Sequence, residues 1–136
     1  MGCKPLIVLD THVLIWWLSN ISFLSPKARR IIAKESLRKG IVVSAISALE
    51  ITTLVRRGRL RLSVPVATWL ADAQRLPELR FEPVSVEIAQ LAGSFGEEIP
   101  GDPADRIITA TATILNGPLV TADAKLRAYK PLTTVW

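Results

Sequence analysis

The chain has 136 residues, of which 49% are hydrophobic, and a formal net charge of +5. This length fits one domain, which we place at residues 1–136, and the hydrophobic fraction excludes an intrinsically disordered chain. The single cysteine, Cys3, excludes an internal disulfide and a metal cluster held by thiolates. The positive charge indicates an anionic partner, either a nucleic acid or an acidic protein segment.

Strand and helix patterns alternate along almost the whole chain. In chain order, the sequence predicts a strand at 5–10, helices at 11–18 and 26–38, a strand at 41–46, helices at 47–60 and 64–74, a connector or minor strand at 80–85, helices at 85–95 and 101–117, a strand at 118–123, a short helix at 124–129 and a last strand at 132–136. This alternation predicts an α/β fold with a mostly parallel central sheet and helices on both faces.

The opening run "PLIVLDTHVLIWWLSN" is apolar except where Asp10, Thr11 and His12 interrupt it. A membrane-spanning helix needs about 18 uninterrupted apolar residues. The chain has no such run, so we expect a soluble, cytoplasmic protein with no membrane contact. A buried carboxylate is costly unless it is hydrogen-bonded, paired or bound to a cation. We therefore expect Asp10 at the carboxyl end of the first strand, outside the core, with a cation as its partner.

Five acids fall where strands end or helices begin: Asp10, Glu50, Asp102, Asp105 and Asp123. In parallel sheets these positions share one edge, where ligands bind. Each acid also has a structural explanation, because carboxylates in the first turn of a helix cap it. The sequence from Ser47 to Glu50, in the first turn of its predicted helix, matches a capping box, and Asp102 is a good N-cap. Taken singly, Glu50 and Asp102 are more typical of structural roles.

Together the acids are harder to explain as caps, because carboxylates a few ångströms apart repel one another. A hard cation would neutralise them, and oxygen donors without thiolates are typical of Mg²⁺ or Mn²⁺ sites. The chemistry that such a site favours is phosphodiester hydrolysis, in which a bound metal generates hydroxide from water.

Four blocks carry a family resemblance: "LIVLDTHVLIWWL", "VVSAISALEITTLVRRGRL", "GDPADRIITATA" and "LVTADAKL". Together they resemble the PIN-domain ribonucleases, most closely the VapC-type toxins of bacterial toxin–antitoxin pairs, in the same order and over residues 6–126. The resemblance implies a PIN-like three-layer α/β/α sandwich and an endoribonuclease that depends on one or two Mg²⁺ or Mn²⁺ ions per active site. It also implies a homodimer and a small cognate antitoxin whose tail enters the active site.

Carried over by position, the resemblance implies that Asp10 and Asp105 are direct metal ligands. It implies that Glu50 and Asp123 bind the metal or its water. Thr11 and Thr121 match positions where the family often has a small hydroxyl residue near the acids. Asp102 departs from the pattern, because many relatives have a single acid in the third block. It is an N-cap, a residue of the metal's outer coordination sphere, or a ligand of a second metal.

Basic and aromatic residues have two readings each. Arg56, Arg57 and Arg59, with Arg61, would either track an RNA backbone or form a solvated helix end. Arg106 would either steady a scissile phosphate or form a surface ion pair.

His12 is a candidate general base, although a metal-bound hydroxide needs none, and a structural role is favoured. Trp16 and Trp17 would stack on unpaired bases or, as we favour, supply one ring to the core and one to an interface with a second subunit or an antitoxin.

Two other functions fit parts of the sequence. One is a non-catalytic PIN-like module that binds protein or RNA and keeps the acids for fold or partner contact. The other is a small phosphohydrolase with a strand-end aspartate nucleophile. Such enzymes generally carry a second aspartate two residues on, where this chain has His12.

Overall fold

A computed structural model describes residues 5–99 and 102–136 of the chain. The strands are β1 (Ile7–Leu9), β2 (Ile41–Ser44), β3 (Leu79–Glu82), β4 (Leu119–Val120) and β5 (Thr134–Val135). The helices are α1 (Thr11–Ser19), the 3₁₀ helix η1 (Ile21–Phe23), α2 (Pro26–Leu37), α3 (Ile46–Arg56), α4 (Val66–Gln74), α5 (Val86–Ser94), α6 (Pro103–Leu115) and α7 (Ala124–Ala128). Cys3 and Gly101, which enter the predictions above, lie outside the described residues.

The described strands form one five-stranded sheet in the order β3-β2-β1-β4-β5. Every neighbouring pair is parallel, with Val8 of β1 opposite both Val42 of β2 and Leu119 of β4. The predicted α/β fold is therefore confirmed, and this sheet is wholly parallel. The segment that the sequence left open as a connector or minor strand forms β3, at one edge.

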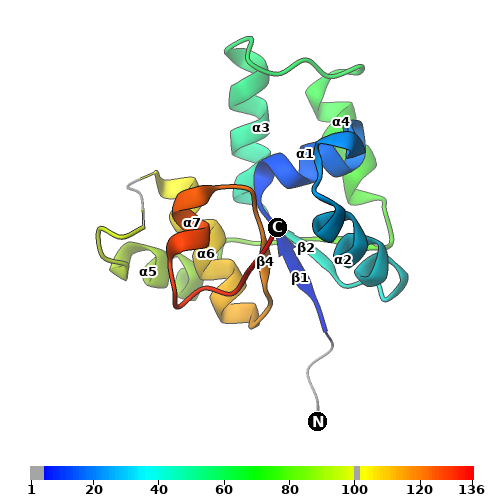
Figure 1. Ribbon diagram of the computed structural model, residues 1–136. Helices are drawn as coiled ribbons and strands as arrows, with labels where there is room; N and C mark the ends of the chain where they lie inside the picture. Colours follow the sequence, from blue (N-terminus) through cyan, green and yellow to red (C-terminus); the bar gives the residue numbers. More distant parts are fainter. Residues whose placement is uncertain (1–4, 100–101) are drawn as a thin grey trace.

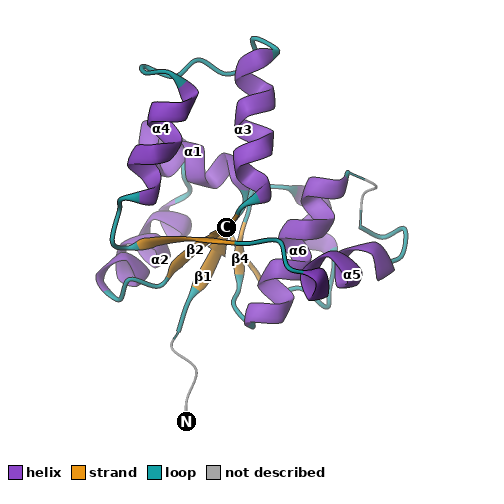
Figure 2. Ribbon diagram, turned by 180° about the vertical axis from the view of Figure 1, so that it is seen from behind, coloured by secondary structure: helices purple, strands orange, loops and turns teal. Residues whose placement is uncertain are grey.

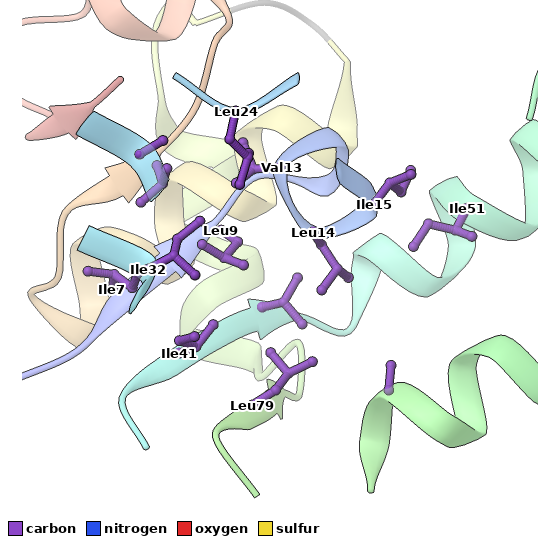
Figure 3. Close-up of a cluster of buried hydrophobic side chains, with 14 of the residues drawn as sticks. Ile7, Leu9, Val13, Leu14, Ile15, Leu24, Ile32, Ile41, Ile51 and Leu79 are labelled. Atoms are coloured by element: carbon purple, nitrogen blue, oxygen red, sulfur yellow. The ribbon is translucent and has the colours of Figure 1, made fainter. Parts of the chain in front are cut away.

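One face of the sheet packs on the larger hydrophobic cluster. Alternate residues of a strand point to opposite faces, and Ile7 and Leu9 of β1 join this cluster with Leu14 of α1 and Ile32 of α2. Figure 3 shows these side chains gathered over the strands, with Leu79 of β3 at the edge. All are nearly or fully inaccessible to solvent, so this face holds α1, α2 and the inner sides of α3 and α4.

The opposite face packs on α6 and α7. Val8 of β1, Val42 of β2 and Leu119 of β4 form this second cluster with Ile108 and Leu126. Helix α5 lies outside α6 and buries Ile88 and Ala92 against it. Figure 1 shows α5, α6 and α7 on one side of the sheet and α2 and α4 on the other, and Figure 2 shows the same layers from behind. The predicted three-layer α/β/α sandwich is confirmed.

The sequence misplaced the start of α3. This helix begins at Ile46, whose backbone N–H donates to Ser44 Oγ at 3.1 Å. Ser47 lies inside the helix with its side chain turned to Thr11, so the predicted capping box from Ser47 to Glu50 is wrong. Glu50 consequently lies in the second turn and not in the first.

Other helix signals are confirmed. The Ser25 Oγ accepts from the backbone N–H of Ala28, and the Ser85 Oγ accepts from that of Ile88. The Asp102 carboxylate accepts from the backbone N–H of Ala104, as expected for an N-cap. Within the described residues, no helix is both long and apolar enough to cross a membrane.

The approach of Gly40 to the start of β1 generates a stability prediction. A Cβ at Gly40 would lie 2.7 Å from the carbonyl oxygen of Pro5 and 2.9 Å from Oε1 of Glu35. We expect Gly40→Ala to lower the free energy of unfolding by about 1–3 kcal/mol, because the backbone must shift. The control is Gly93→Ala in α5, where a Cβ meets nothing within 4 Å. It should change stability by less than about 1 kcal/mol, in the stabilising direction. Equal losses in urea denaturation would contradict this account of Gly40.

Candidate active site

The acids meet at the carboxyl edge of the sheet, as the strand and helix order predicted. Asp10 follows β1, Glu50 lies on α3, Asp102 and Asp105 lie at the start of α6, and Asp123 precedes α7. All five line one cavity of about 370 Å³, whose other walls are His12, Val13, Trp16 and Ala122. Residues from opposite ends of the chain thus form a single acidic cavity.

Asp10 is fixed by two donors. Its Oδ1 accepts from the backbone N–H of Thr11 at 2.9 Å, and its Oδ2 accepts from Thr121 Oγ1 at 2.7 Å. The side chain is 9% exposed, so the expectation that Asp10 lies outside the core is wrong. Burial raises the pKa of Asp10 despite the hydrogen bonds from Thr121 and Thr11, and Asp123 adds to the rise. An ionised carboxylate here therefore needs further positive charge.

A short hydroxyl chain holds Glu50. Thr11 Oγ1 donates to Glu50 Oε1 and lies 2.7 Å from Ser47 Oγ. A hydroxyl has a single proton. Because the Thr11 hydroxyl donates its proton to Glu50, it must accept the hydrogen bond from the Ser47 hydroxyl. Burial is the main cause that raises the pKa of Glu50, and the charges of Asp10 and Asp102 raise it further. Ser47 is the member of this chain that the sequence did not identify as part of the site, because its spacing to Glu50 matched a helix cap.

Asp105 is affected by the charges of the other four acids. Burial and the charges of Asp10, Asp102, Asp123 and Glu50 together raise its pKa from 3.8 to about 7. Every one of these causes acts in the same direction. The shift shows that the carboxylates are close enough to compete for protons, so this cavity disfavours the simultaneous ionisation of all its acids.

Asp102 and Asp123 share a second role as helix caps. The Asp123 Oδ1 accepts from the backbone N–H of Lys125 at 2.8 Å, in the same way as Asp102 accepts at the start of α6. The backbone N–H of Asp123 donates to Thr121 Oγ1 at 3.0 Å. Thr121 therefore links Asp10 to Asp123, which gives this threonine a defined place beside two of the acids.

The donor set suits a hard divalent cation, because it consists of carboxylate oxygens with a net negative charge. The electrostatic cost at Asp105 is of the kind that such a cation would remove. As they stand, however, the His, Asp and Glu side chains of residues 5–99 and 102–136 include no group of three or more that could hold a metal ion. The fit is one of chemistry and charge, and the carboxylates would have to turn toward a common point to bind an ion.

The aromatic rings of α1 contact the acidic cavity, the core, or both. His12 is exposed, and its ring centroid lies 5.8 Å from that of Trp16. Both residues line the acidic cavity. Trp16 and Trp17 are both partly buried, and both pack on the larger hydrophobic cluster. The expectation that only one of the two rings belongs to the core is therefore wrong, and an interface role for either ring stays a prediction.

Arg106 has partners that the sequence did not suggest. Its Nε donates to the carbonyl oxygen of Ala92 at 3.0 Å, and its terminal nitrogens donate to those of Phe95, Gly96 and Ile99. The guanidinium thereby ties the end of α5 and the segment after it to the start of α6. Arg106 forms no ion pair within the described residues, so the predicted surface ion pair is wrong. Its contact with a scissile phosphate stays a prediction.

The arginines at the end of α3 are exposed, as predicted. Arg57 and Arg59 line a second cavity beside the acids, whereas Arg61 lines a cavity between α1 and α4. That cavity is larger, about 560 Å³, but the acid on its wall, Asp72, pairs with Arg75 at 2.9 Å. The concentration of unpaired carboxylates marks the smaller acidic cavity as the candidate active site.

Comparison with known proteins agrees with the fold. Residues 7–131 match the model of the PIN domain family. The chain is 37% identical over 134 residues to Ribonuclease VapC22 of Mycobacterium tuberculosis, which covers 96% of this chain and 98% of the relative.

Solved structures share the fold at lower identity. A chain of VapBC2 from Rickettsia felis, bound to a DNA fragment from their promoter, is 17% identical, with a TM-score of 0.70 over 95% of this chain and 96% of that one. A chain of FitAcB from Neisseria gonorrhoeae is 23% identical, with a TM-score of 0.62 over 95% and 96%. The match of the family model across almost the whole chain, together with the 37% identity, shows that this chain belongs to the PIN domain family.

Proposed function

We propose that this chain is an endoribonuclease that depends on Mg²⁺ or Mn²⁺ and that acts as the toxin of a toxin–antitoxin pair. The observation that carries the proposal is the cavity in which five carboxylates meet and in which Asp105 has a pKa of about 7. The sequence relative at 37% identity is named a ribonuclease, which supports RNA as the substrate. The positive net charge of the chain suits an RNA strand approaching from outside the cavity.

The acids of the cavity would have different roles in the reaction. A bound metal would supply a hydroxide at neutral pH and would stabilise the leaving oxygen of the phosphodiester. Asp10 and Asp105 would hold the metal, and Asp123 would bind the metal or its water. Asp10 has a lone pair left on each oxygen after its two hydrogen bonds.

Glu50 would orient the attacking water. Its Oε1 is held by Thr11, and Thr11 is itself positioned by Ser47, so the free oxygen of Glu50 has a defined direction. Asp102 would contribute charge from the rim, since it is exposed and occupied as the cap of α6. These supports limit the motion of the carboxylates, which keeps their geometry ready for the reaction.

For partners we propose a small antitoxin and a second copy of this chain. The solved chains that share the fold support the antitoxin, since one comes from a toxin–antitoxin complex of Klebsiella pneumoniae at a TM-score of 0.57. An antitoxin tail with basic residues would suit the acidic cavity by charge. The homodimer rests on the family resemblance of the sequence blocks.

Loss of a metal-binding carboxylate should abolish RNA cleavage. We expect Asp105→Asn and Asp10→Asn to lower the rate of cleavage more than about 100-fold, and EDTA to do the same to the parent. The matched control is Asp72→Asn, which removes an acid from an exposed ion pair on α4. Gel assays of total RNA with Mn²⁺ give the rates, and circular dichroism checks the fold. Full cleavage by both active-site variants, or no Mn²⁺ binding to the parent by calorimetry, would favour the non-catalytic module.

The raised pKa of Asp105 predicts how stability depends on pH without metal. Between about pH 4 and pH 7 the folded state holds the Asp105 proton that the unfolded state has lost, so stability falls as pH rises through this window. We expect Asp105→Asn to remove a large part of this fall and to exceed the parent in stability at neutral pH in EDTA. Mn²⁺ should restore the parent alone. Urea denaturation at acidic and neutral pH measures both effects, and a less stable variant at neutral pH would refute them.

The hydroxyl chain to Glu50 can be tested by an isosteric change. Thr11→Val keeps the volume of a residue that is 1% exposed but removes the donor to Glu50. We expect cleavage to fall about 10- to 100-fold, as when a partner of a metal ligand is lost. Thr11→Ser retains the hydroxyl and should recover most of the activity. Equal rates for the valine and serine variants would show that Thr11 does not position Glu50.

A further inference from the structure

A second cavity adjoins the acids. It has a volume of about 360 Å³ and shares His12, Glu50 and Asp102 with the acidic cavity. It runs along α3 and the start of α6, and we name it the α3–α6 cavity. Its remaining walls include Leu49, Leu54, Arg57, Arg59 and Pro103. If one phosphate of a nucleic acid strand lies at the acids, the adjoining nucleotide on the α3 side therefore lies next to this cavity.

One wall of the α3–α6 cavity is apolar and open. Leu49 is 62% exposed, although it directly precedes Glu50 on α3. Pro103 is also exposed at the start of α6, and Leu54 lies further along α3 toward its end. An exposed apolar wall beside a charged site offers a contact surface to a ligand with an apolar face, such as a base.

The far end of the cavity is basic. Arg57 follows the last turn of α3, and Gly58 adopts a φ of 72°, which turns the chain so that Arg59 comes back beside it. The backbone N–H groups of Arg57 and Arg59 are bonded to the carbonyl oxygens of Thr53 and Leu54, both at 2.9 Å. Both side chains are exposed, and the ion pairs of the described residues involve other arginines. The backbone hydrogen bonds fix the positions of Arg57 and Arg59, and neither guanidinium group forms an ion pair within the described residues.

We propose that the α3–α6 cavity binds the nucleotide next to the scissile phosphate of a single-stranded RNA. The base lies against Leu49 and Pro103, and the following phosphate is held by Arg57 and Arg59. Arg57 lies seven positions after Glu50, which is about 10 Å along the helix axis. The cavity is thus acidic where a metal would bind and basic one nucleotide away. The inference rests on the proposed ribonuclease function and adds a position that would set base preference.

The arginines are tested through the salt dependence of RNA binding. The probe is a fluorescent single-stranded RNA of randomised sequence, bound with Mg²⁺ to the Asp105→Asn protein so that it is not cleaved. Each phosphate contact contributes about 0.7 to the slope of log affinity against log salt for a single strand. Because Arg57 and Arg59 hold one phosphate together, replacing both with alanine should reduce the slope by roughly 0.7. The control pair, Arg29→Ala and Arg30→Ala on α2, removes the same charge from another exposed surface and should leave the slope close to that of the parent.

The apolar wall is tested through the kinetics of the otherwise unmodified enzyme. Leu49→Ala should raise KM for RNA cleavage and leave kcat near the parent value, because the base contact is equal in the ground and transition states. Sequencing of the cleaved ends should show a weaker preference at the nucleotide beside the cut. Leu37→Ala, at a side chain that is 88% exposed at the end of α2, is the control and should change neither.

The outcomes separate the subsite from the function itself. If the parent cleaves no RNA with Mn²⁺, the proposed function fails. If the parent cleaves RNA but the two arginine pairs shift the slope equally, or Leu49→Ala leaves KM unchanged, the subsite alone is wrong. Poly-glutamate serves as a second probe. If the variant that lacks Arg57 and Arg59 bound RNA as well as the parent but lost binding to poly-glutamate, the cavity would be assigned to an acidic protein segment, and the inference would be overturned.

Discussion

The structure depends on one electrostatic constraint, the repulsion among carboxylates that the fold brings to a single partly buried cavity. Burial alone disfavours each charge, and every neighbour adds to the cost. The effect is clearest at Asp105, where burial and four like charges act together. For the other four acids, a specific hydrogen-bond donor offsets part of this cost. A bound cation would offset the remainder.

The parallel sheet explains how the compensation is arranged. Strands that all run one way place the N-termini of the following helices at one edge, and these ends carry partial positive charge. Asp10, Asp102 and Asp123 each accept a backbone N–H at such a helix start. Glu50 lies deeper in its helix and receives a hydroxyl from Thr11 instead. Asp105 has only causes that raise its pKa, so an added cation would favour its ionisation directly.

The features that could be predicted from the sequence are those that depend on residues close together in the chain. Caps at Ser25, Ser85 and Asp102 and the order of strands and helices follow from spacing within a few residues, and all are found in the structure. Contacts between distant segments were not visible in the same way. Ser47 has the spacing of a cap, but the oxygen of Ser44 was better placed, which left Ser47 free to bond Thr11.

Arg106 shows the same limit. Its carbonyl partners lie 7 to 14 residues earlier, at the end of α5 and in the segment after it, and no periodicity of the sequence points to them.

The position of Asp10 beside β4 has a consequence for synthesis. Its carboxylate takes a hydrogen bond from Thr121, 111 residues later in the chain. Strand β4, which pairs with β1 directly, also comes from that late segment. A growing chain on the ribosome therefore carries Asp10 without its partner, and without Asp105 or Asp123, until most of the protein has been made. The acidic cavity is assembled last, so a chain that stops short lacks the site altogether.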